Sequence, residues 1–326
     1  MSRCLMRAAV IVALSAVPAL SAVGEESRKG PSDVSFFPPW QKGANNPSDD
    51  KGLEFTVREA DNLADFHGDL TNARLVLYVG GNYFFAMAPL VQAFEAKHPE
   101  LKGKIYYETI PPGLLARQMK AGGRITVGNM TWTAKPDAYF AGLVAVKRLI
   151  DEGELVGPPV AYATNQLTIM VPKGNPAKIT SLSDLGRPDI QLAMPNPEFE
   201  GVSRQVKAAL SKAGGEALVK AVYETKVNDG TTHLTRMHHR QTPVWLMQGR
   251  AQAGVTWRSE AIFQNLERLP TDHVDIPADQ NVTGIYGGAV VKGAAHEQEA
   301  RLWLDFLTGP EAQKVFAGYG FGKYEP

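Results

Sequence analysis

The sequence has almost no cysteine and no excess of charge of either sign. Cys4 is the only cysteine, and it lies ahead of an apolar run rather than at its end, where a lipid-attachment cysteine would stand. Removal of a leader containing Cys4 would exclude disulfides, thiolate metal sites and cysteine nucleophiles. Lysine plus arginine and aspartate plus glutamate both number 34. No global field therefore draws the protein to nucleic acid or an anionic membrane, and a charged ligand must be held by local groups.

Motifs of several enzyme classes are also missing. The sequence contains no G-x-S-x-G nucleophile elbow, no GK[ST] of a P-loop and no H-E-x-x-H zinc motif. Without a cysteine in the mature chain, only serine, threonine or lysine could act as a nucleophile. We therefore expect a binding protein that is not an enzyme and needs no cofactor. A metal hydrolase built on histidines and carboxylates is the enzyme alternative.

The N-terminus carries the one apolar run that has the form of a targeting signal. Arg3 and Arg7 precede AAVIVALSAVPAL (8–20), and small residues follow. This order is typical of a cleavable signal peptide, and the run is too short to span a bilayer. The alternative is a buried N-terminal helix. We predict a signal peptide over residues 1–24, with cleavage near Ser21–Gly24, and a monomeric periplasmic protein.

Residues 25–72 have the composition of an N-terminal arm. The segment SFFPPWQKGANNPSDDKG is rich in proline, glycine and asparagine. Phe36, Phe37 and Trp40 are expected to pack on the body of the protein, because exposed aromatic residues promote adhesion.

A pattern of strand, turn and helix begins near residue 74. LVLYV (75–79) is a short strand-like run, and GGN (80–82) is a turn. The helix that follows has Met87, Leu90, Val91 and Phe94 at the spacing of one amphipathic face. Asn82 is the predicted N-cap of this helix.

The same pattern recurs at 104–123, 191–215 and 253–266, which predicts an α/β fold with mostly parallel sheets. A length of 326 residues corresponds to about two domains of roughly 150 residues. Two long extended stretches, 162–176 and 274–293, are predicted to cross between these domains. We therefore expect lobe I to comprise residues 73–163 and 278–326, and lobe II to comprise residues 164–277.

Several segments resemble the molybdate-binding type of periplasmic solute-binding protein, the receptor component of an ABC importer. The matching segments are LARQMKAGG (115–123), LTIMVPKGNPAKITSLSDLGRPDIQLAMPNPEFEG (167–201), MQGRAQAGVTWRSEA (247–261) and AVVKGAAHEQEARLWLDFLTGPEAQKVFAGYGF (289–321). The resemblance implies a type II periplasmic-binding-protein fold, in which each lobe is a mostly parallel sheet flanked by helices and two hinge strands connect the lobes. It also implies a small anion as ligand, a permease in the inner membrane as partner, and no nucleic acid.

The ligand-binding positions of the family can be transferred singly. Family members hold molybdate with serine hydroxyls, backbone amides and a tyrosine. The corresponding ligand-binding residues here are Gly81, Asn82, Gly113, Glu200, Gly201, His238, His239 and Trp257. Asn82 replaces a serine but can still donate, the position at Gly113 lacks a hydroxyl, and Trp257 replaces the tyrosine with one N–H donor.

The segment RMHHRQTPVW (236–245) leaves several roles open. Its histidines could be metal ligands, a catalytic pair, polar groups lining a pocket, or residues that only form hydrogen bonds to the backbone of a loop. Thr242 and Pro243 predict the N-cap and first residue of a helix, which places His238, His239 and Arg240 in the preceding loop. The resemblance puts that loop in the wall of the cleft.

Glu200 conflicts with a simple molybdate site. An ionised carboxylate about 4 Å from a dianion would oppose it by roughly 4 kcal/mol at an effective dielectric constant of about 20. We expect Glu200 to point away, or to pair with Arg204 or Arg240, or the ligand to differ from bare molybdate. Two alternatives to an anion-binding protein of an importer remain. One is a protein that binds a metal ion or metal complex through Glu200, His238 and His239, and the other is a ligand sensor that signals to a membrane kinase.

Overall fold

The computed structural model describes residues 65–127, 130–198, 200–235 and 240–326. The predicted signal peptide and nearly all of the predicted arm, including Phe36, Phe37 and Trp40, therefore lie outside the described residues. The last part of the arm enters the sheet, because Asp65–His67 forms an edge strand antiparallel to Ile105–Ile110. Phe66 packs edge-on against Trp132, with 4.9 Å between ring centroids.

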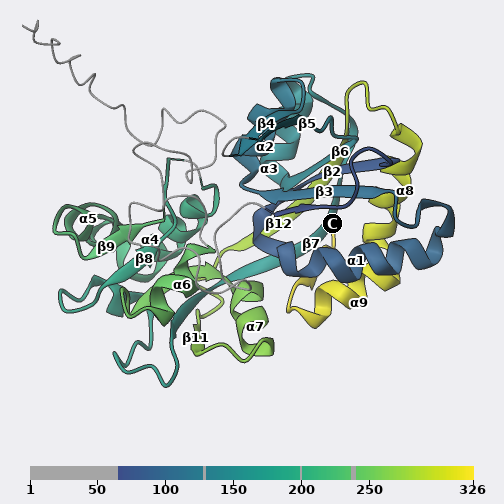
Figure 1. The fold of residues 1–326 in the computed structure, drawn as a ribbon. Coiled ribbons are helices and arrows are strands. Elements are labelled where there is room, and N and C mark those ends of the chain that lie inside the picture. The colour runs from purple at the N-terminus through teal and green to yellow at the C-terminus, as the bar shows by residue number, and fades with distance from the viewer. Residues whose placement is uncertain (1–64, 128–129, 199, 236–239) are drawn as a thin grey trace, which may run out of the picture.

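The described residues form one large sheet of 11 strands, a separate two-stranded sheet, and helices packed around them (Figure 1). The strands are β1 (Asp65–His67), β2 (Leu75–Gly80), β3 (Ile105–Ile110), β4 (Arg124–Val127), β5 (Met130–Thr133), β6 (Ala138–Gly142), β7 (Leu155–Pro172), β8 (Leu192–Met194), β9 (Thr232–Leu234), β10 (Ala253–Trp257), β11 (Thr271–Asp275), β12 (Thr283–Val291) and β13 (Gly322–Lys323). The α-helices are α1 (Phe84–Lys97), α2 (Pro112–Lys120), α3 (Leu143–Asp151), α4 (Val202–Lys220), α5 (Lys226–Asn228), α6 (Gln241–Met247), α7 (Arg258–Leu266), α8 (Glu297–Thr308) and α9 (Pro310–Gly318).

The large sheet has the strand order β1-β3-β2-β6-β12-β7-β10-β8-β9, with β11 and β13 also paired to β7. The strands that precede crossover helices are parallel to their neighbours: β2 to β3 and β6, and β8 to β9 and β10. The pairings of β7 and β12 are antiparallel. The first half of the sheet is β1, β3, β2 and β6, the second half is β10, β8 and β9, and both halves have the predicted α/β construction.

The strand β7 runs through both halves of the sheet. Over Leu155–Gln166 it pairs with β12, and over Leu167–Pro172 it pairs with β10 and β11. This is the first predicted crossing stretch, although the strand begins seven residues before residue 162. The second predicted stretch is divided into the end of β11 and the whole of β12.

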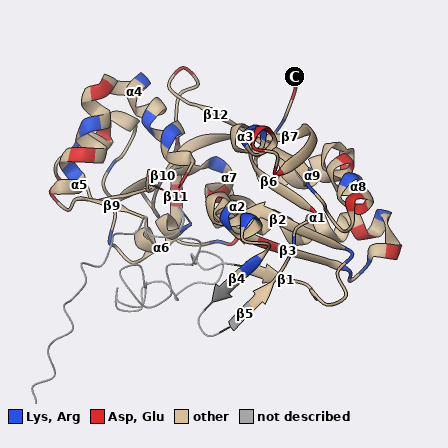
Figure 2. Ribbon diagram, turned by 90° about the horizontal axis from the view of Figure 1, so that it is seen from above, with Lys and Arg blue, Asp and Glu red and all other residues tan. Residues whose placement is uncertain are grey.

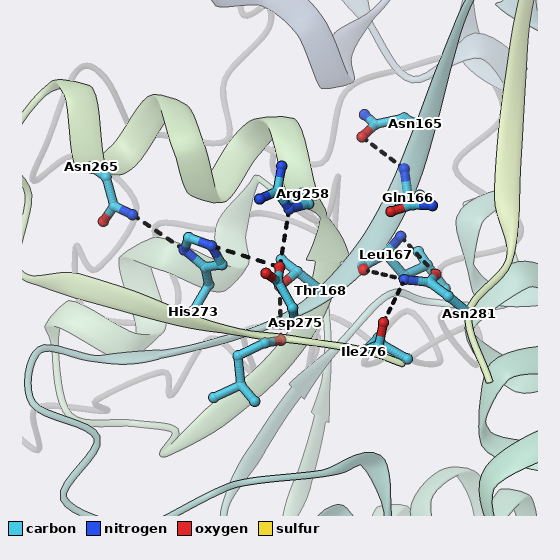
Figure 3. Close-up of polar contacts among 11 residues, drawn as sticks. Asn165, Gln166, Leu167, Thr168, Arg258, Asn265, His273, Asp275, Ile276 and Asn281 are labelled. Carbon is cyan, nitrogen blue, oxygen red and sulfur yellow. Dashed lines mark hydrogen bonds and ion pairs between the residues drawn. The ribbon is translucent and has the colours of Figure 1, made fainter. Parts of the chain in front are cut away.

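Asn281 connects this interrupted segment to β7. Its Oδ1 accepts the main-chain N–H of Leu167 at 3.1 Å, and its Nδ2 donates to the Leu167 carbonyl at 2.9 Å (Figure 3). Close by, Arg258 of α7 donates to Asp275 of β11 at 3.0 Å, and His273 contacts Asn265. These contacts join the two segments to each other and join β11 to both ends of α7.

The hydrophobic core is built from separate groups of side chains in the two halves. Two groups surround the first half and draw on residues 75–163 and 286–321, together with Phe263. Two others surround the second half and draw on residues 167–276. Strand residues such as Leu77 and Leu192 are fully buried because helices cover both faces of the central strands.

Two predicted helix starts are wrong. Asn82 is not an N-cap, because Gly81–Tyr83 forms a 3-10 turn and α1 begins only at Phe84. The helix predicted to start at Thr242 and Pro243 starts earlier, at Gln241, with Arg240 at the N-cap position. Pro243 is tolerated there because it is still in the first turn, where its missing N–H would have no intrahelical partner.

Charged side chains of both signs are interspersed on the helices, as α4 and α8 show (Figure 2). This agrees with the equal numbers of acidic and basic residues. Among the described residues, no helix is both long enough and apolar enough to cross a membrane.

Candidate ligand-binding site

The carboxyl ends of both sets of parallel strands point toward the same short part of β7. Pairing through β6 and β12 places Val79, near the end of β2, level with Val160 of β7. Trp257, the last residue of β10, pairs with Leu167. Because β2 runs in the same direction as β7 and β10 runs against it, their ends face each other. Ligands of α/β sheets bind beyond the carboxyl ends of the strands, so this is the place to look for a site.

The loops after these strands carry the residues predicted from the sequence. The 3-10 turn Gly81–Tyr83 follows β2, and α2 follows β3. In the second half, α4 follows β8 and α7 follows β10 directly. The first N–H groups of an α-helix have no intrahelical acceptor and carry a partial positive charge, so these ends favour anions.

Asn82 is joined to a residue that the sequence did not single out. Its Nδ2 donates to the hydroxyl oxygen of Tyr286, on β12, at 2.5 Å. The same oxygen accepts from Nδ2 of Asn165, on β7, at 3.3 Å, and Asn165 also donates to Oγ of Ser259, on α7, at 2.7 Å. All four residues are buried. One chain of hydrogen bonds thus runs from the turn after β2, across β12 and β7, to the helix after β10.

Tyr286 keeps its proton at neutral pH. Burial is the main cause that raises the pKa of its phenol well above the ordinary value, and the nearby Glu260 carboxylate adds to the effect. The hydrogen bonds from Asn165 and Asn82 act in the opposite direction. The group is therefore a neutral hydroxyl with a hydrogen to donate.

Trp257 lies beside Tyr286. The two rings are 5.9 Å apart between centroids and inclined at 60°, and Trp257 is buried. Gly284 leaves room for the indole, because a Cβ at that position would lie 2.3 Å from the ring. Asn82 and Trp257 are therefore gathered around one tyrosine, and Gly81 precedes Asn82 in the turn after β2.

Gly113 lies close to this group, at the exposed start of α2. The preceding residue, Pro112, accepts a hydrogen bond from the Tyr139 hydroxyl through its carbonyl oxygen at 2.9 Å. Pro112 also lies next to Gly80, since a Cβ on Gly80 would be 3.2 Å from the proline ring. Gly113 is the second residue of the helix, so its N–H is among those that lack an intrahelical acceptor.

Glu200 and Gly201 lie at the start of α4. The Glu200 carboxylate accepts hydrogen bonds from the main-chain N–H of Asn196, at 3.1 Å, and from the hydroxyl of Thr235. Its side chain thus ties the loop after β8 to the end of β9. A carboxylate can only accept when ionised, so this role fits Glu200 better than contact with an anion. Gly201 is exposed at the N-cap position of α4.

His238 and His239 lie outside the described residues. Arg240, which follows them, is buried, and its guanidinium carbon lies 3.7 Å from the centroid of the Phe84 ring at the start of α1. This contact joins the loop before α6 to the first half of the protein. Within the described ranges, no three His, Cys, Asp or Glu side chains are grouped as a metal site.

Sequence reasoning missed Tyr286, Asn165 and Ser259. Tyr286 and Asn165 do lie in the two stretches predicted to cross between lobes. The signal that could have found them is a polar side chain in a segment expected to line the space between the lobes.

The fold and this arrangement define a binding protein with two α/β halves joined by crossing strands. The profile of the bacterial extracellular solute-binding protein family matches residues 75–322, and the chain belongs to that family. The family resemblance and the expectation of a binding protein rather than an enzyme are both confirmed.

Individual relatives are similar over most of the chain. YvgL of Bacillus subtilis, which carries the name ABC transporter substrate-binding lipoprotein, is 24% identical over 72% of this chain and 81% of its own length. The molybdate-binding protein ModA of Mycobacterium tuberculosis is 25% identical over 73% of this chain and 83% of its own. The solved structure of the sulfate-binding protein SubI from Mycobacterium tuberculosis superposes with a TM-score of 0.63 at 20% identity, covering 77% of this chain and 87% of that one. That likeness shows the fold, which is the predicted type II periplasmic-binding-protein fold.

Proposed function

We propose that the protein is the solute-binding component of an ABC importer and captures a small oxyanion of the molybdate, tungstate or sulfate type. The relatives named for an ABC transporter, for molybdate and for sulfate support this class of ligand and partner. The observation that carries the proposal is the convergence of neutral hydrogen-bond donors from facing strand ends on residues 160–167 of β7. Such donors hold a desolvated oxyanion without a formal cation.

In this proposal the two lobes are residues 73–163 with 278–326, and residues 164–277. The separate hydrophobic cores of the two halves support this division. The lobes close over the anion and exclude water, which strengthens each hydrogen bond to it. Gly81, Asn82 and Gly113 contribute from lobe I, and Gly201 and Trp257 contribute from lobe II.

A titration calorimetry experiment tests the ligand class. Molybdate, tungstate, sulfate and phosphate are each titrated into the purified mature protein, and a parallel series uses divalent and trivalent metal ions. We expect at least one tetrahedral oxyanion to bind, and at 100 times its Kd to stabilise the fold by about 2.7 kcal/mol. Binding of metal ions with no response to any of the four oxyanions would refute the proposal.

A variant locates the site. Asn82→Ala is expected to weaken anion binding by about tenfold or more, which corresponds to about 1.4 kcal/mol for one lost hydrogen bond. Asn72→Ala is the matched control, because Asn72 bonds only within its own exposed turn, to Asp69. Equal affinities of both variants and the wild type would place the anion elsewhere.

A further inference from the structure

The side-chain amide of Asn165 has a defined orientation. Its Oδ1 accepts the main-chain N–H of Gln166 at 3.0 Å (Figure 3). The opposite orientation would set an NH₂ group against that N–H, with a donor facing a donor. The Nδ2 of Asn165 must therefore face the other side, where it donates one hydrogen to Ser259 and the other to Tyr286.

This orientation determines the role of both hydroxyl oxygens. Ser259 Oγ and the Tyr286 oxygen each accept a hydrogen from Asn165, and Tyr286 accepts a second one from Asn82. Each hydroxyl still has its own hydrogen to donate. Among the described residues, neither hydrogen has an acceptor, because these three bonds are the ones that the two hydroxyls make.

Such unused donors are costly where they lie. Ser259 is 0% exposed and Tyr286 is 4% exposed, so water cannot freely replace a missing acceptor. A buried polar group without a partner costs about 1–3 kcal/mol. The Ser259 and Tyr286 hydroxyls both bond to Asn165, where the facing strand ends meet. Two unused donors at this position indicate a binding site for a hydrogen-bond acceptor.

The two hydroxyls also come from different parts of the fold. Ser259 is the second residue of α7, in the turn of helix that follows Trp257 and β10. Tyr286 is on β12, next to the turn that follows β2. An acceptor that reaches both hydroxyls would touch the second half of the protein and the crossing strand together.

We propose that Tyr286 and Ser259 are ligand-binding residues whose hydroxyls donate hydrogen bonds to the oxygen atoms of the bound oxyanion, with Asn165 holding both in the donating orientation. The inference rests on the proposed function and names donors within that site. Asn165 is a positioning residue in this arrangement, since both of its amide hydrogens are already used.

The test compares Tyr286→Phe and Ser259→Ala with matched controls by titration calorimetry, with sodium molybdate and sodium sulfate as probes. Tyr162→Phe is the control for the tyrosine, because the Tyr162 hydroxyl bonds to that of Tyr83 in the same aromatic group. Ser203→Ala is the control for the serine, because Ser203 is also the second residue of its helix but donates to the Glu200 carbonyl at 2.7 Å.

We expect Tyr286→Phe and Ser259→Ala each to raise the Kd for the anion by about tenfold or more, and the controls to change it by less than about threefold. Ser259→Thr retains the hydroxyl and is expected to recover most of the affinity, which a loss of helix structure would not allow. Thermal unfolding without anion verifies that every variant is folded, and the serine and tyrosine variants test the idea independently.

Wild-type affinity in both Tyr286→Phe and Ser259→Ala would overturn this inference and leave the proposed function intact. A wild-type protein that binds neither molybdate nor sulfate, nor any other oxyanion, would refute the proposed function itself. Equal weakening by the test variants and their controls would show that the hydroxyls act only through packing, and would also overturn the inference.

Discussion

Glu108 makes the stability of the protein depend on pH. It is a strand residue of β3, 0% exposed within the core of the first half. Its Oε1 accepts hydrogen bonds from the Tyr106 hydroxyl, at 3.1 Å, and from Gln118, at 3.2 Å. Its Oε2 is buried without a hydrogen-bond partner among the described residues. Burial, which outweighs these hydrogen bonds, raises the pKa of Glu108 from 4.5 to about 8.

The direction of the effect follows from the two pKa values. Below pH 4.5 the carboxyl is protonated in both the folded and the unfolded chain, and between pH 4.5 and about 8 only the unfolded chain ionises. The unfolded state then binds fewer protons, so the free energy of unfolding falls as the pH rises through this window. Each pH unit within this window lowers the free energy of unfolding by about 1.4 kcal/mol. The loss attributable to Glu108 is therefore roughly 3 kcal/mol at pH 7, and it is complete above about pH 8.

Glu108→Gln removes this dependence, because an amide does not ionise. Urea unfolding of wild type and variant at pH 5, 6, 7 and 8 measures the free energies of unfolding. The free energy of unfolding of the variant, relative to that of the wild type, is expected to rise by several kcal/mol between pH 5 and pH 8, on the order of 1.4 kcal/mol per pH unit. Any difference in packing is the same at every pH, so the slope is the diagnostic quantity.

Glu224→Gln is the control, because it makes the same substitution at an exposed side chain. Parallel stability curves for wild type and Glu108→Gln between pH 5 and pH 8 would refute the reasoning.

Three further substitutions test packing and hydrogen bonding. Gly284→Ala places a Cβ 2.3 Å from the Trp257 ring, so the free energy of unfolding in urea should fall by about 1–3 kcal/mol; an unchanged value would contradict this packing. Asn281→Ala removes two hydrogen bonds to the main chain of Leu167 and should lower the free energy of unfolding in urea by about 1–3 kcal/mol. A change below about 0.5 kcal/mol would count against a role of Asn281 in joining the two segments. Lys226→Met removes the donor from two main-chain carbonyls, at 2.8 and 2.7 Å, and should lower the melting temperature; a higher melting temperature would contradict this.

Much of the fold could be predicted because strand and helix periodicities alternate clearly along the chain. The pattern of strand, turn and helix predicted over 253–266 corresponds to β10 and α7, which together span Ala253–Leu266. The beginning of β7 could not be predicted, because LVGPPVA (155–161) contains one glycine and two prolines, which are unfavourable in strands. Pairing with β12 keeps this segment extended.

The candidate site could be predicted only in outline. The loops after the strands were identified, since turn residues follow each strand-like run. The hydrogen bonds of Asn165 to Ser259 and Tyr286 join residues that are 94 and 121 positions apart in the chain, so no local pattern indicates them. Asn82 shows the same limit. Asparagine is favoured at helix N-caps, but the side chain of Asn82 donates a hydrogen bond to the distant Tyr286 and does not cap α1.

The position of β12 between β6 and β7 has a consequence for folding during synthesis. The first half of the sheet is made early in synthesis, but β12, which pairs with β6, and residues 286–321 of the surrounding core are made at the end. Its central layer stays incomplete until about residue 291 has emerged, and contacts between such distant segments form slowly. The first half of the protein thus remains without a finished core until nearly the whole chain has been translated, whereas the core of the second half needs only residues 167–276.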